Sequence, residues 1–552
     1  MAAILAVAAV GLGVRLTALD QGFWFDEVVS ISTAGEPMGE LLFRAAFYDA
    51  HTPLYYALLR GWTALFGTAE WAVRLLSLLF SAGTLLLVGL WARPRGGWSA
   101  FLAVGLLSVS TFHVHYSVEA RAFCMVAFLV TAWLMLLERL ERSRDARLPA
   151  WVLAGAVQSL MVLSSGYTLP LVVAANIHFY TARRRSPARL LRWSLVQTWS
   201  IALCSTWLPA LMIQWFRFPA EPASVQTAMA AASDLLMYLG ISTVHPSYVV
   251  GWLGTLLPLA AAGIAMARSF GAERRPNAEP DDADSARPLS FTARLHVAAA
   301  MLASLLGPVA AVLLIPTTES TMSVLVGELA RGYFVIIGAL FLVAIGPLVN
   351  RSVVAAGHGV AAVPFVLLLG TLLLAALFCL HRPFPPRQVL FLAPPILVLA
   401  ATAWVPSRML GKAAVCALAL ALAVPSLMER NKAFEPRQDL RAAAAFVTER
   451  VPFQVPEQPG LVIPMWDRPA LEYYFGADRA EGVMKPQQIA SAARKAQSVT
   501  LVLTREAFDE RKAFRDSAGR LLGPRFHLKE TGQFRGVYVA HFVRSTNKGV
   551  SP

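Results

Sequence analysis

The stretch FDEVVS places two adjacent carboxylates, Asp26 and Glu27, among aromatic residues just after an apolar N-terminal run. Paired carboxylates held at a fixed place can accept a proton or hold a cation, and enzymes use acids in both ways. A second interpretation is a solvated helix start, because acidic side chains stabilise the N-terminus of a helix. The surroundings of the two acids decide between these interpretations.

Four arginines lie near the ends of apolar runs. They are Arg74 in WAVRLLS, Arg121 in YSVEARAF, Arg331 in ELARGYF and Arg387 in PFPPRQV. Ionisable residues at such positions usually face a cavity or a charged partner instead of lipid. Arginine is suited to bidentate contacts with phosphate, so these positions are candidates for binding an anion. The alternative for Arg121 is a local ion pair with Glu119 at a helix end.

The histidines do not favour a metal site. His113 and His115 in FHVHY are two residues apart, a spacing that does not put both on one face of a helix, as i and i+4 would. His51 lies beside Asp49 in DAHTPLYY, close in sequence to the acidic pair. These two side chains could shape a substrate site, or they could bind an ion together with Asp26.

The composition predicts a helical membrane protein. Of the 552 residues, 57% are hydrophobic and 15% are charged, whereas soluble proteins carry about 25% charged residues. A helix needs roughly 20 apolar residues to cross the hydrocarbon core of a bilayer. About thirteen apolar runs approach this length, near 2–19, 71–91, 98–116, 118–138, 149–166, 168–181, 193–213, 248–267, 295–316, 333–349, 354–380, 389–406 and 413–427.

Lysine and arginine are concentrated in alternate loops between these runs, including 139–147, 183–192 and 268–294. By the positive-inside rule these loops are cytoplasmic, so the N-terminus lies inside and Asp26 lies outside. An odd number of spans also places the tail outside. The net charge of +14 is therefore a topology signal. Because the basic residues form no single stripe, the charge does not indicate nucleic-acid binding.

The composition changes after residue 427, which divides the chain into a transmembrane domain, 1–427, and a C-terminal domain, 428–552. In the tail, GLVIPMW and SVTLVLT have the short apolar pattern of buried strands. The stretches NKAFEPRQDLRAAAAFVTER, PALEYYFG and REAFDERKAFRD have helical patterns. Helices that alternate with short apolar strands predict a small extracytoplasmic α/β domain.

The expected outer loop, 20–70, contains two amphipathic stretches. Apolar residues recur at helical spacing, at Met38, Leu41, Leu42 and Ala45 and again at Leu54, Leu58, Trp62 and Leu65. Such helices lie on the membrane surface with their apolar sides in the bilayer. They can form the wall of a cavity at the interface, with Asp26, Glu27, Asp49 and His51 at its mouth.

Several motifs follow one another in an order that resembles a known family. They are FDEVVS, DAHTPLYYALLRGWTALFG, EWAVRLLSLLFS, FHVHYSVEARAF, PRQVLFLAPPILVLAATAW and DLRAAAAFV. Their order and spacing resemble the polytopic glycosyltransferase family 39, whose members have the C-type membrane glycosyltransferase fold. The family is related to protein O-mannosyltransferases and to lipid A aminoarabinose transferases. The resemblance covers the spanning region and reaches into the tail.

This resemblance implies a reaction on the outer face of a bacterial plasma membrane. A hexosyl or pentosyl group would pass from a polyprenyl-phosphate donor to an acceptor hydroxyl on a protein, a lipid or a glycan. The family's acidic pair matches Asp26, as the base that takes the acceptor's proton, and Glu27, as the carboxylate that orients the acceptor. The cofactor stays open, because the family does not uniformly require a divalent metal.

The resemblance also implies where the donor phosphate binds. It supports Arg121, within the EAR triplet, and Arg387, within the PR motif, more than Arg331. The family usually has Arg-Tyr at the second motif, and Gln388 stands at the tyrosine position here. The residues expected to bind the substrates are Asp49, His51, Arg74, Tyr116, Glu119, Arg121 and Arg387.

Two other functions are alternatives to the enzyme. A transporter or lipid flippase would show inverted repeats and acids near the middle of its spans, and the expected spans hold almost no such acids. A structural anchor for the outer domain would not explain a long amphipathic first loop. The sequence therefore predicts an enzyme that works at the interface, and it leaves the sugar, the acceptor and the metal dependence open.

Overall fold

The structure, a computed structural model, describes most of the first 207 residues and parts of the remainder. The described residues are 2–47, 51–143, 147–181, 187–205, 207, 362–380, 386–403, 411–412, 439–450, 461–464, 473–474, 480–483, 497–504, 520, 522 and 525–545. Asp49, Arg331 and the expected spans at 248–267, 295–316, 333–349 and 413–427 lie outside the described residues.

The chain forms two compact units. The helical unit comprises Met1–Thr17, Leu42–Tyr55 and Leu75–Ala433, and the loop-sheet unit comprises Ala18–Leu41, Tyr56–Arg74 and Phe434–Pro552. The segments around Asp26 and around Glu70 therefore group with the C-terminal tail. The domain boundary predicted after residue 427 stays a prediction.

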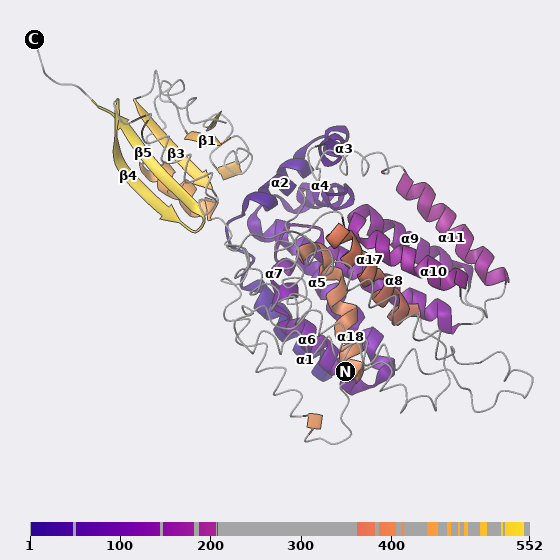
Figure 1. The fold of residues 1–552 in the computed structure, drawn as a ribbon. Helices are drawn as coiled ribbons and strands as arrows, with labels where there is room; N and C mark the ends of the chain where they lie inside the picture. Colours follow the sequence, from indigo (N-terminus) through magenta and orange to yellow (C-terminus); the bar gives the residue numbers. More distant parts are fainter. Residues whose placement is uncertain are drawn as a thin grey trace, which may run out of the picture. The chain divides into compact units, whose positions relative to one another are not determined.

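Helices form the described part of the helical unit (Figure 1). They are α1 (Ala2–Leu16), α5 (Glu70–Ala92), α6 (Gly97–Val109), α7 (Thr111–Ser117), α8 (Phe123–Arg142), α9 (Leu148–Ser164), α10 (Leu169–Thr181), α11 (Pro187–Ser205), α17 (Ala362–Leu380) and α18 (Ala393–Ala403), with short 3-10 turns η1 (Arg93–Arg95), η2 (Gly166–Thr168) and η4 (Pro386–Leu392). α1 packs against α6, α8 against α9, and α10 against α17.

Two helices in the described ranges are long and apolar enough to cross a membrane, at Glu70–Arg95 and Phe123–Arg142. A third span results if α6 and α7, which meet at a bend of 62°, are taken together. Shorter apolar helices lie at Ala2–Leu16, Leu148–Ser164 and Arg387–Thr402. The chain is thus a mostly helical membrane protein, as the sequence predicts, while the expected number of about thirteen spans is not confirmed.

Arg15 of α1 fills the break between α6 and α7. Because α6 ends at Val109, its last carbonyl oxygens lack partners within the helix. Arg15 is fully buried, and its guanidinium donates hydrogen bonds to the carbonyl oxygens of Leu107, at 3.2 Å, and Ser108, at 3.0 Å. Its Nη2 atom lies 2.9 Å from Nδ1 of His113 on α7. The buried cation is therefore satisfied by polar groups that the break exposes.

The two amphipathic helices predicted in the first loop are present as α3 (Met38–Phe47) and α4 (Leu54–Phe66). The apolar residues of α4 divide between two sides of the helix. Leu59 is fully buried, whereas Leu58 and Leu65 are exposed. A helix with apolar residues on both its packed side and its open side is suited to a bilayer surface, because its open side can meet lipid.

A sheet of five described strands lies in the C-terminal tail, with the order β2-β1-β3-β5-β4 (Figure 1). The strands are β1 (Leu461–Pro464), β2 (Ala480–Val483), β3 (Ser498–Thr504), β4 (Phe526–Phe534) and β5 (Val537–Arg544). β1 is parallel to β2 and β3, whereas β5 is antiparallel to β3 and β4. Gly536, at φ 65°, makes the turn between β4 and β5, a conformation that favours glycine.

The observed elements of the tail extend what the sequence predicts. β1 and β3 confirm the strands predicted in GLVIPMW and SVTLVLT, and α20 (Leu440–Arg450) confirms a helix in the stretch that ends at Arg450. β2, β4 and β5 were not predicted. β4 reads FHLKETGQF, and its many polar side chains do not give the apolar pattern of a buried strand. The strand forms because its backbone pairs with β5.

His541 on β5 is expected to make the stability of this sheet depend on pH. It is buried, and its Nδ1 atom lies 2.9 Å from the hydroxyl of Thr500 on β3. Burial, together with the charge of Lys529, lowers the pKa of His541, although Glu530 opposes this shift. The unfolded chain takes up a proton near the ordinary histidine value of about 6.5, while the folded sheet takes it up only at lower pH. The stabilisation is therefore fully present above about pH 6.5 and is lost as the pH falls toward the folded-state pKa.

Hydrogen exchange of the β3 and β5 amides, corrected for the intrinsic exchange rate, measures this effect. Protection should fall between about pH 7.5 and about pH 5.5. His541→Asn, which cannot be protonated in this range, should remove the pH dependence. His527→Asn on β4 is the matched control, because His527 is exposed and its replacement should leave the dependence intact. Equal protection at both pH values would contradict the prediction.

Candidate active site

The acidic pair lies in the first turn of α2 (Phe25–Gly35). Trp24 is the N-cap residue, and its backbone N–H donates a hydrogen bond to Oε2 of Glu27 over 3.3 Å. Asp26 is only 8% exposed and Glu27 is fully buried. The two acids therefore begin a helix, but their burial does not fit the alternative of a solvated helix start.

Glu27 forms a buried, bidentate ion pair with Arg74 of α5. The Nε atom of Arg74 lies 2.8 Å from Oε1 of Glu27, and Nη2 lies 2.6 Å from Oε2. Both side chains have an exposed fraction of 0%. Taking two charges out of water is costly unless the geometry is good and the remaining donors are satisfied. Both conditions are met here, because the two parallel hydrogen bonds occupy both carboxylate oxygens.

The remaining donors of Arg74 bind the loop that precedes α2. They reach the backbone carbonyl oxygens of Leu19, at 2.9 Å, Gln21, and Gly22, at 3.0 Å. The guanidinium also lies over the ring of Phe23, 5.1 Å from its centroid. Arg74 thus joins α5 to both the loop and the start of α2. Its expected role in substrate binding stays a prediction, and the structure gives it this internal role.

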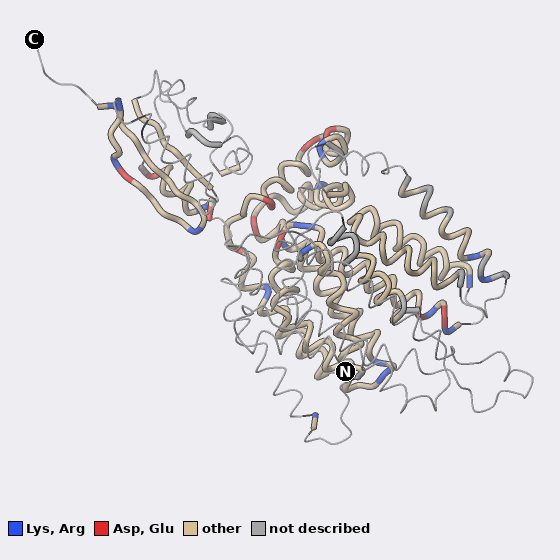
Figure 2. The backbone as a smooth tube through the Cα atoms, in the orientation of Figure 1, with Lys and Arg blue, Asp and Glu red and all other residues tan. Residues whose placement is uncertain are grey.

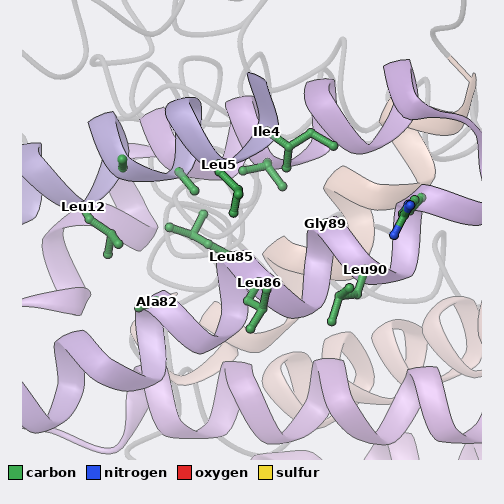
Figure 3. A pocket seen from close by; sticks show the side chains of 12 residues that line it. Ile4, Leu5, Leu12, Ala82, Leu85, Leu86, Gly89 and Leu90 are labelled. Carbon is green, nitrogen blue, oxygen red and sulfur yellow. The ribbon is translucent and has the colours of Figure 1, made fainter. Parts of the chain in front are cut away.

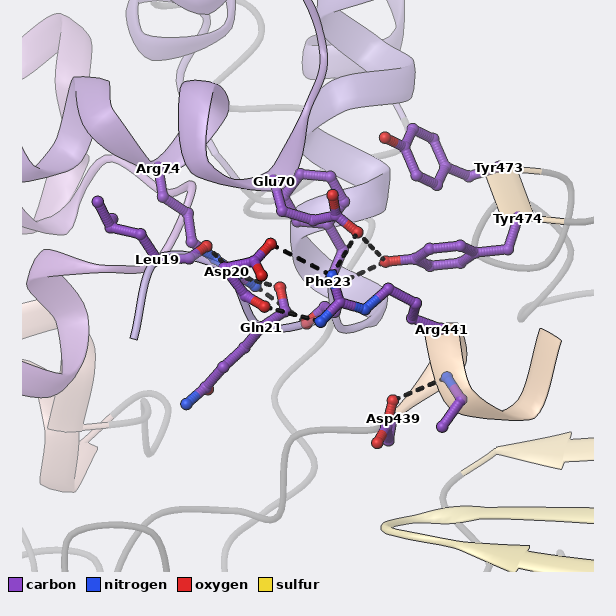
Figure 4. A network of polar contacts seen from close by, with 12 residues as sticks. Leu19, Asp20, Gln21, Phe23, Glu70, Arg74, Asp439, Arg441, Tyr473 and Tyr474 are labelled. Atoms are coloured by element: carbon purple, nitrogen blue, oxygen red, sulfur yellow. Dashed lines mark hydrogen bonds and ion pairs between the residues drawn. The ribbon is translucent and has the colours of Figure 1, made fainter. Parts of the chain in front are cut away.

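Two tyrosines of the tail complete this cluster (Figure 4). The backbone N–H of Phe23 donates to the hydroxyl of Tyr474 over 2.7 Å, and that hydroxyl lies 3.4 Å from Oε1 of Glu70. The ring of Tyr473 packs edge-on against Phe23, with 5.5 Å between ring centroids. Burial raises the pKa of Tyr474 above its ordinary value, and the carboxylate of Glu70 adds to the shift. The phenol therefore keeps its proton and donates a hydrogen bond to Glu70.

Sequence reasoning missed part of this acid cluster, which we define as Phe23, Asp26, Glu27, Glu70, Arg74 and Tyr474. Phe23, Glu70 and Tyr474 were not among the expected site residues. The paired tyrosines in EYYFG are the signal in the sequence that could have drawn attention to this part of the tail. Their partner could not be named, because it lies far away along the chain.

A second group of expected residues lies in the helical unit, around the link between α7 and α8. Glu119 and Arg121 are in this link, and both are buried. The carbonyl oxygen of Arg121 accepts a hydrogen bond from the hydroxyl of Ser77 over 3.3 Å, which fixes the backbone of the link to α5. The Nε2 atom of His115 lies 4.0 Å from a carboxylate oxygen of Glu119.

Aromatic rings connect this link to the loop before α4. The rings of Tyr116 and His51 both pack edge-on against Phe123, with centroid distances of 5.1 Å for Tyr116 and 6.5 Å for His51. The structure thus brings His51, Tyr116, Glu119 and Arg121 into one neighbourhood, which we call the arginine cluster. These residues are separated by up to 70 positions, and the folding of the helical unit alone places them together.

Arg387 approaches the same neighbourhood from the C-terminal part of the helical unit. It is half-buried at the start of η4, and η4 packs against both α7 and α8. These are the helices on either side of Glu119 and Arg121. The two arginines that the sequence favoured for binding phosphate are therefore on segments that pack together. Among the described residues, no three His, Cys, Asp or Glu side chains gather as metal ligands.

Charges in the described helices lie mainly near the helix ends (Figure 2). One such group forms where α5 and α8 end, because Glu138 forms ion pairs with Arg95 and Arg142, each with a nitrogen–oxygen distance of 2.5 Å. An apolar pocket of about 240 Å³ lies between α1 and α5 (Figure 3). Among the described residues of its lining, Arg93 is the one ionisable side chain.

The comparisons with known proteins concern the family and the fold. Residues 50–209 match the family described as dolichyl-phosphate-mannose-protein mannosyltransferase. No curated protein matches the chain. Among solved structures, ArnT from Cupriavidus metallidurans in the apo state is 16% identical, with a TM-score of 0.48, over 98% of this chain and 97% of that one.

Two further solved structures are similar. ArnT from Cupriavidus metallidurans bound to undecaprenyl phosphate is 14% identical, with a TM-score of 0.47, over 98% of this chain and 97% of that one. The archaeal oligosaccharyltransferase AglB from Archaeoglobus fulgidus, in complex with an inhibitory peptide and a dolichol-phosphate, is 14% identical with a TM-score of 0.44, over 98% and 74%. The match of residues 50–209 confirms the resemblance of this chain to the membrane glycosyltransferases of family 39.

Proposed function

We propose that this protein transfers a sugar from a polyprenyl-phosphate donor to an acceptor hydroxyl on the extracytoplasmic face of a bacterial plasma membrane. The observation that carries the proposal is the match to a family of lipid-phosphate-dependent mannosyltransferases. The matched segment contains His51, Arg74, Glu119 and Arg121. The orientation rests on the distribution of lysine and arginine between alternate loops.

The acid cluster supplies the base. Both oxygens of Glu27 are engaged by Arg74, so Glu27 is poorly placed to take a proton, and the role of base falls to its neighbour Asp26. The acceptor oxygen forms a bond to the anomeric carbon while the bond from that carbon to the phosphate oxygen breaks. The hydroxyl proton passes to Asp26, and polyprenyl phosphate leaves with the bonding electrons. Glu27 holds the start of α2 in place for this step.

The arginine cluster supplies positive charge for the departing phosphate. Arg121 is nearly buried and its backbone is fixed by Ser77. A fixed cation in a water-poor site stabilises a developing negative charge more than a solvated one does.

The transporter alternative is not favoured, because the described spans carry their acids near helix ends. The transferred group is a hexose or a pentose, and the acceptor is a protein hydroxyl, a lipid-linked glycan or an envelope polysaccharide.

The test starts with the lipids that copurify with the full chain. Mass spectrometry of these lipids should detect a polyprenyl phosphate or its glycosylated form, whose head group identifies the sugar. The purified protein, given that donor and a mixture of hydroxyl acceptors, should release polyprenyl phosphate in step with a glycosylated product. Movement of the lipid across liposomes without any product would instead overturn the proposal in favour of a transporter.

Replacing Arg121 or Arg387 with alanine is expected to weaken donor use strongly. Removing one partner of a desolvated charge pair costs about 2–5 kcal/mol, which corresponds to a loss of about 30-fold to about 4,000-fold in kcat/KM for the donor. Arg142→Ala is a control, because Arg142 is 63% exposed at the far end of α8. Wild-type donor kinetics in both Arg121→Ala and Arg387→Ala would mean that the phosphate binds elsewhere.

A further inference from the structure

The loop between α1 and α2, residues 17–24, leads directly to the acidic pair. It contains turns and a bend but no helix or strand. Its conformation must therefore be fixed by contacts with other segments. Arg74 supplies one set of contacts from α5, as described above. A second set comes from the C-terminal tail, through Tyr474 and Arg441 (Figure 4).

Tyr474 bridges two segments of the loop-sheet unit with a single hydroxyl. It accepts the hydrogen bond from the backbone N–H of Phe23 at 2.7 Å, so its own proton points to the carboxylate of Glu70, 3.4 Å away. Glu70 and Arg74 are four residues apart on α5 and lie on one face of that helix. The phenol and the Glu27–Arg74 pair therefore connect the same two segments at two points, one turn of helix apart.

Arg441 holds the beginning of the loop from the first turn of α20. Its guanidinium donates to the carbonyl oxygen of Asp20 over 2.7 Å and to the Asp20 carboxylate over 3.3 Å. It also lies 3.8 Å from Oε1 of Glu70. The approach is close, because a Cβ atom added to Gly22 would lie 2.9 Å from the Cβ of Arg441. Any larger residue at position 22 would push α20 away from the loop.

α20 is itself anchored to the sheet. The carboxylate of Asp439 accepts a hydrogen bond from the backbone N–H of Ala442 over 2.9 Å, which caps the helix. The backbone N–H of Asp439 donates to the carbonyl oxygen of Arg535, in the turn between β4 and β5, also at 2.9 Å. Arg441 thus contacts the loop from a helix that is itself hydrogen-bonded to the turn between β4 and β5.

We infer that Tyr474 is a positioning residue for Asp26, and that the C-terminal tail sets the geometry of the proposed base. This inference rests on the proposed function. Phe23 precedes the N-cap residue Trp24, and Asp26 follows in the first turn, so the path of the backbone at Phe23 sets the direction in which α2 begins. The hydrogen bond from Tyr474 fixes that path. The ring of Phe23, held between Arg74 and Tyr473, fixes it from the other side.

The test compares Tyr474→Phe with Tyr473→Phe. The first change removes only the hydroxyl that binds Phe23 and Glu70. The second removes a hydroxyl from the neighbouring residue, which donates to the carbonyl oxygen of Thr68 at 3.0 Å, and it keeps the ring that contacts Phe23. Both variants keep the volume of the aromatic rings, and the control loses one hydrogen bond of the tail without touching the loop before α2.

Tyr474→Phe is expected to lower kcat by up to roughly 100-fold, the loss that follows from a misplacement of about 1 Å, with the KM for the donor unchanged. The Tyr473→Phe variant should keep kcat near the wild-type value. In an Asp26→Asn background, Tyr474→Phe should cause no further loss, because a residue that acts through Asp26 has nothing left to position. An equal fold-loss in both backgrounds would show a merely structural role and would overturn the inference.

Hydrogen exchange separates this inference from the proposed function. The amide of Phe23 should exchange faster in Tyr474→Phe than in wild type or in Tyr473→Phe, whatever reaction the protein catalyses. Unchanged exchange at Phe23 would overturn the inference even if sugar transfer is found. Faster exchange in a protein that transfers no sugar would support the loop contact and would overturn the proposed function instead.

Discussion

Asp26→Asn is expected to lower sugar transfer by roughly 10²-fold to 10⁴-fold, the contribution of a general base. Asparagine keeps the shape and the hydrogen-bonding reach of the side chain, but it cannot take the acceptor's proton at neutral pH. Binding of the lipid-linked donor should be retained, because the phosphate is expected at Arg121 and Arg387. Transfer and donor binding should therefore be measured on the same purified preparation.

The control for this change is Glu40→Gln. Glu40 is an exposed acid in the first turn of α3, so like Asp26 it lies in the first turn of a helix of the first loop, but on the surface. Its neutralisation tests whether the loss of any acid at a helix start in the first loop is enough to reduce transfer. Near wild-type transfer by the Asp26→Asn protein would remove Asp26 from the role of base.

Breaking the Glu27–Arg74 pair is expected to have the largest effect on stability. Removing one partner of a buried ion pair costs about 3–5 kcal/mol, because the other charge is left without compensation. Arg74→Gln would leave the Glu27 carboxylate buried, and it would also remove the donors that bind the carbonyl oxygens of Leu19 and Gly22. The apparent Tm of the detergent-purified protein should fall clearly for Arg74→Gln and for Glu27→Gln.

The double variant distinguishes a charge effect from a loss of packing. With Glu27→Gln and Arg74→Gln combined, no uncompensated charge stays buried, so the loss should be smaller than the sum of the two single losses. Arg441→Gln is the comparison on the surface, because Arg441 is 46% exposed and its partner Asp20 is 84% exposed. Exposed pairs contribute about 0–1 kcal/mol. Strictly additive losses for Glu27 and Arg74 would contradict the pairing.

Patterns that repeat over short distances made much of the fold predictable from the sequence. The apolar runs predicted α5 and α8, because a bilayer imposes a minimum length on any spanning helix. The helical spacing of apolar residues predicted α3 and α4, and two short apolar stretches predicted β1 and β3. The resemblance of the motif order to a family then indicated which acids and arginines to examine, and residues 50–209 match such a family.

The sequence by itself thus determined a helical membrane protein with two amphipathic helices in its first loop, because those features depend on neighbouring residues. Only the tertiary structure decided which partners the acids meet. Glu27 and Arg74 are 47 positions apart, and Phe23 and Tyr474 are 451 positions apart. A buried carboxylate and an arginine can each pair with many partners of opposite charge, and local spacing carries no information about the choice. The choice depends on how distant segments pack, since burial makes an unpaired charge far more costly than a paired one.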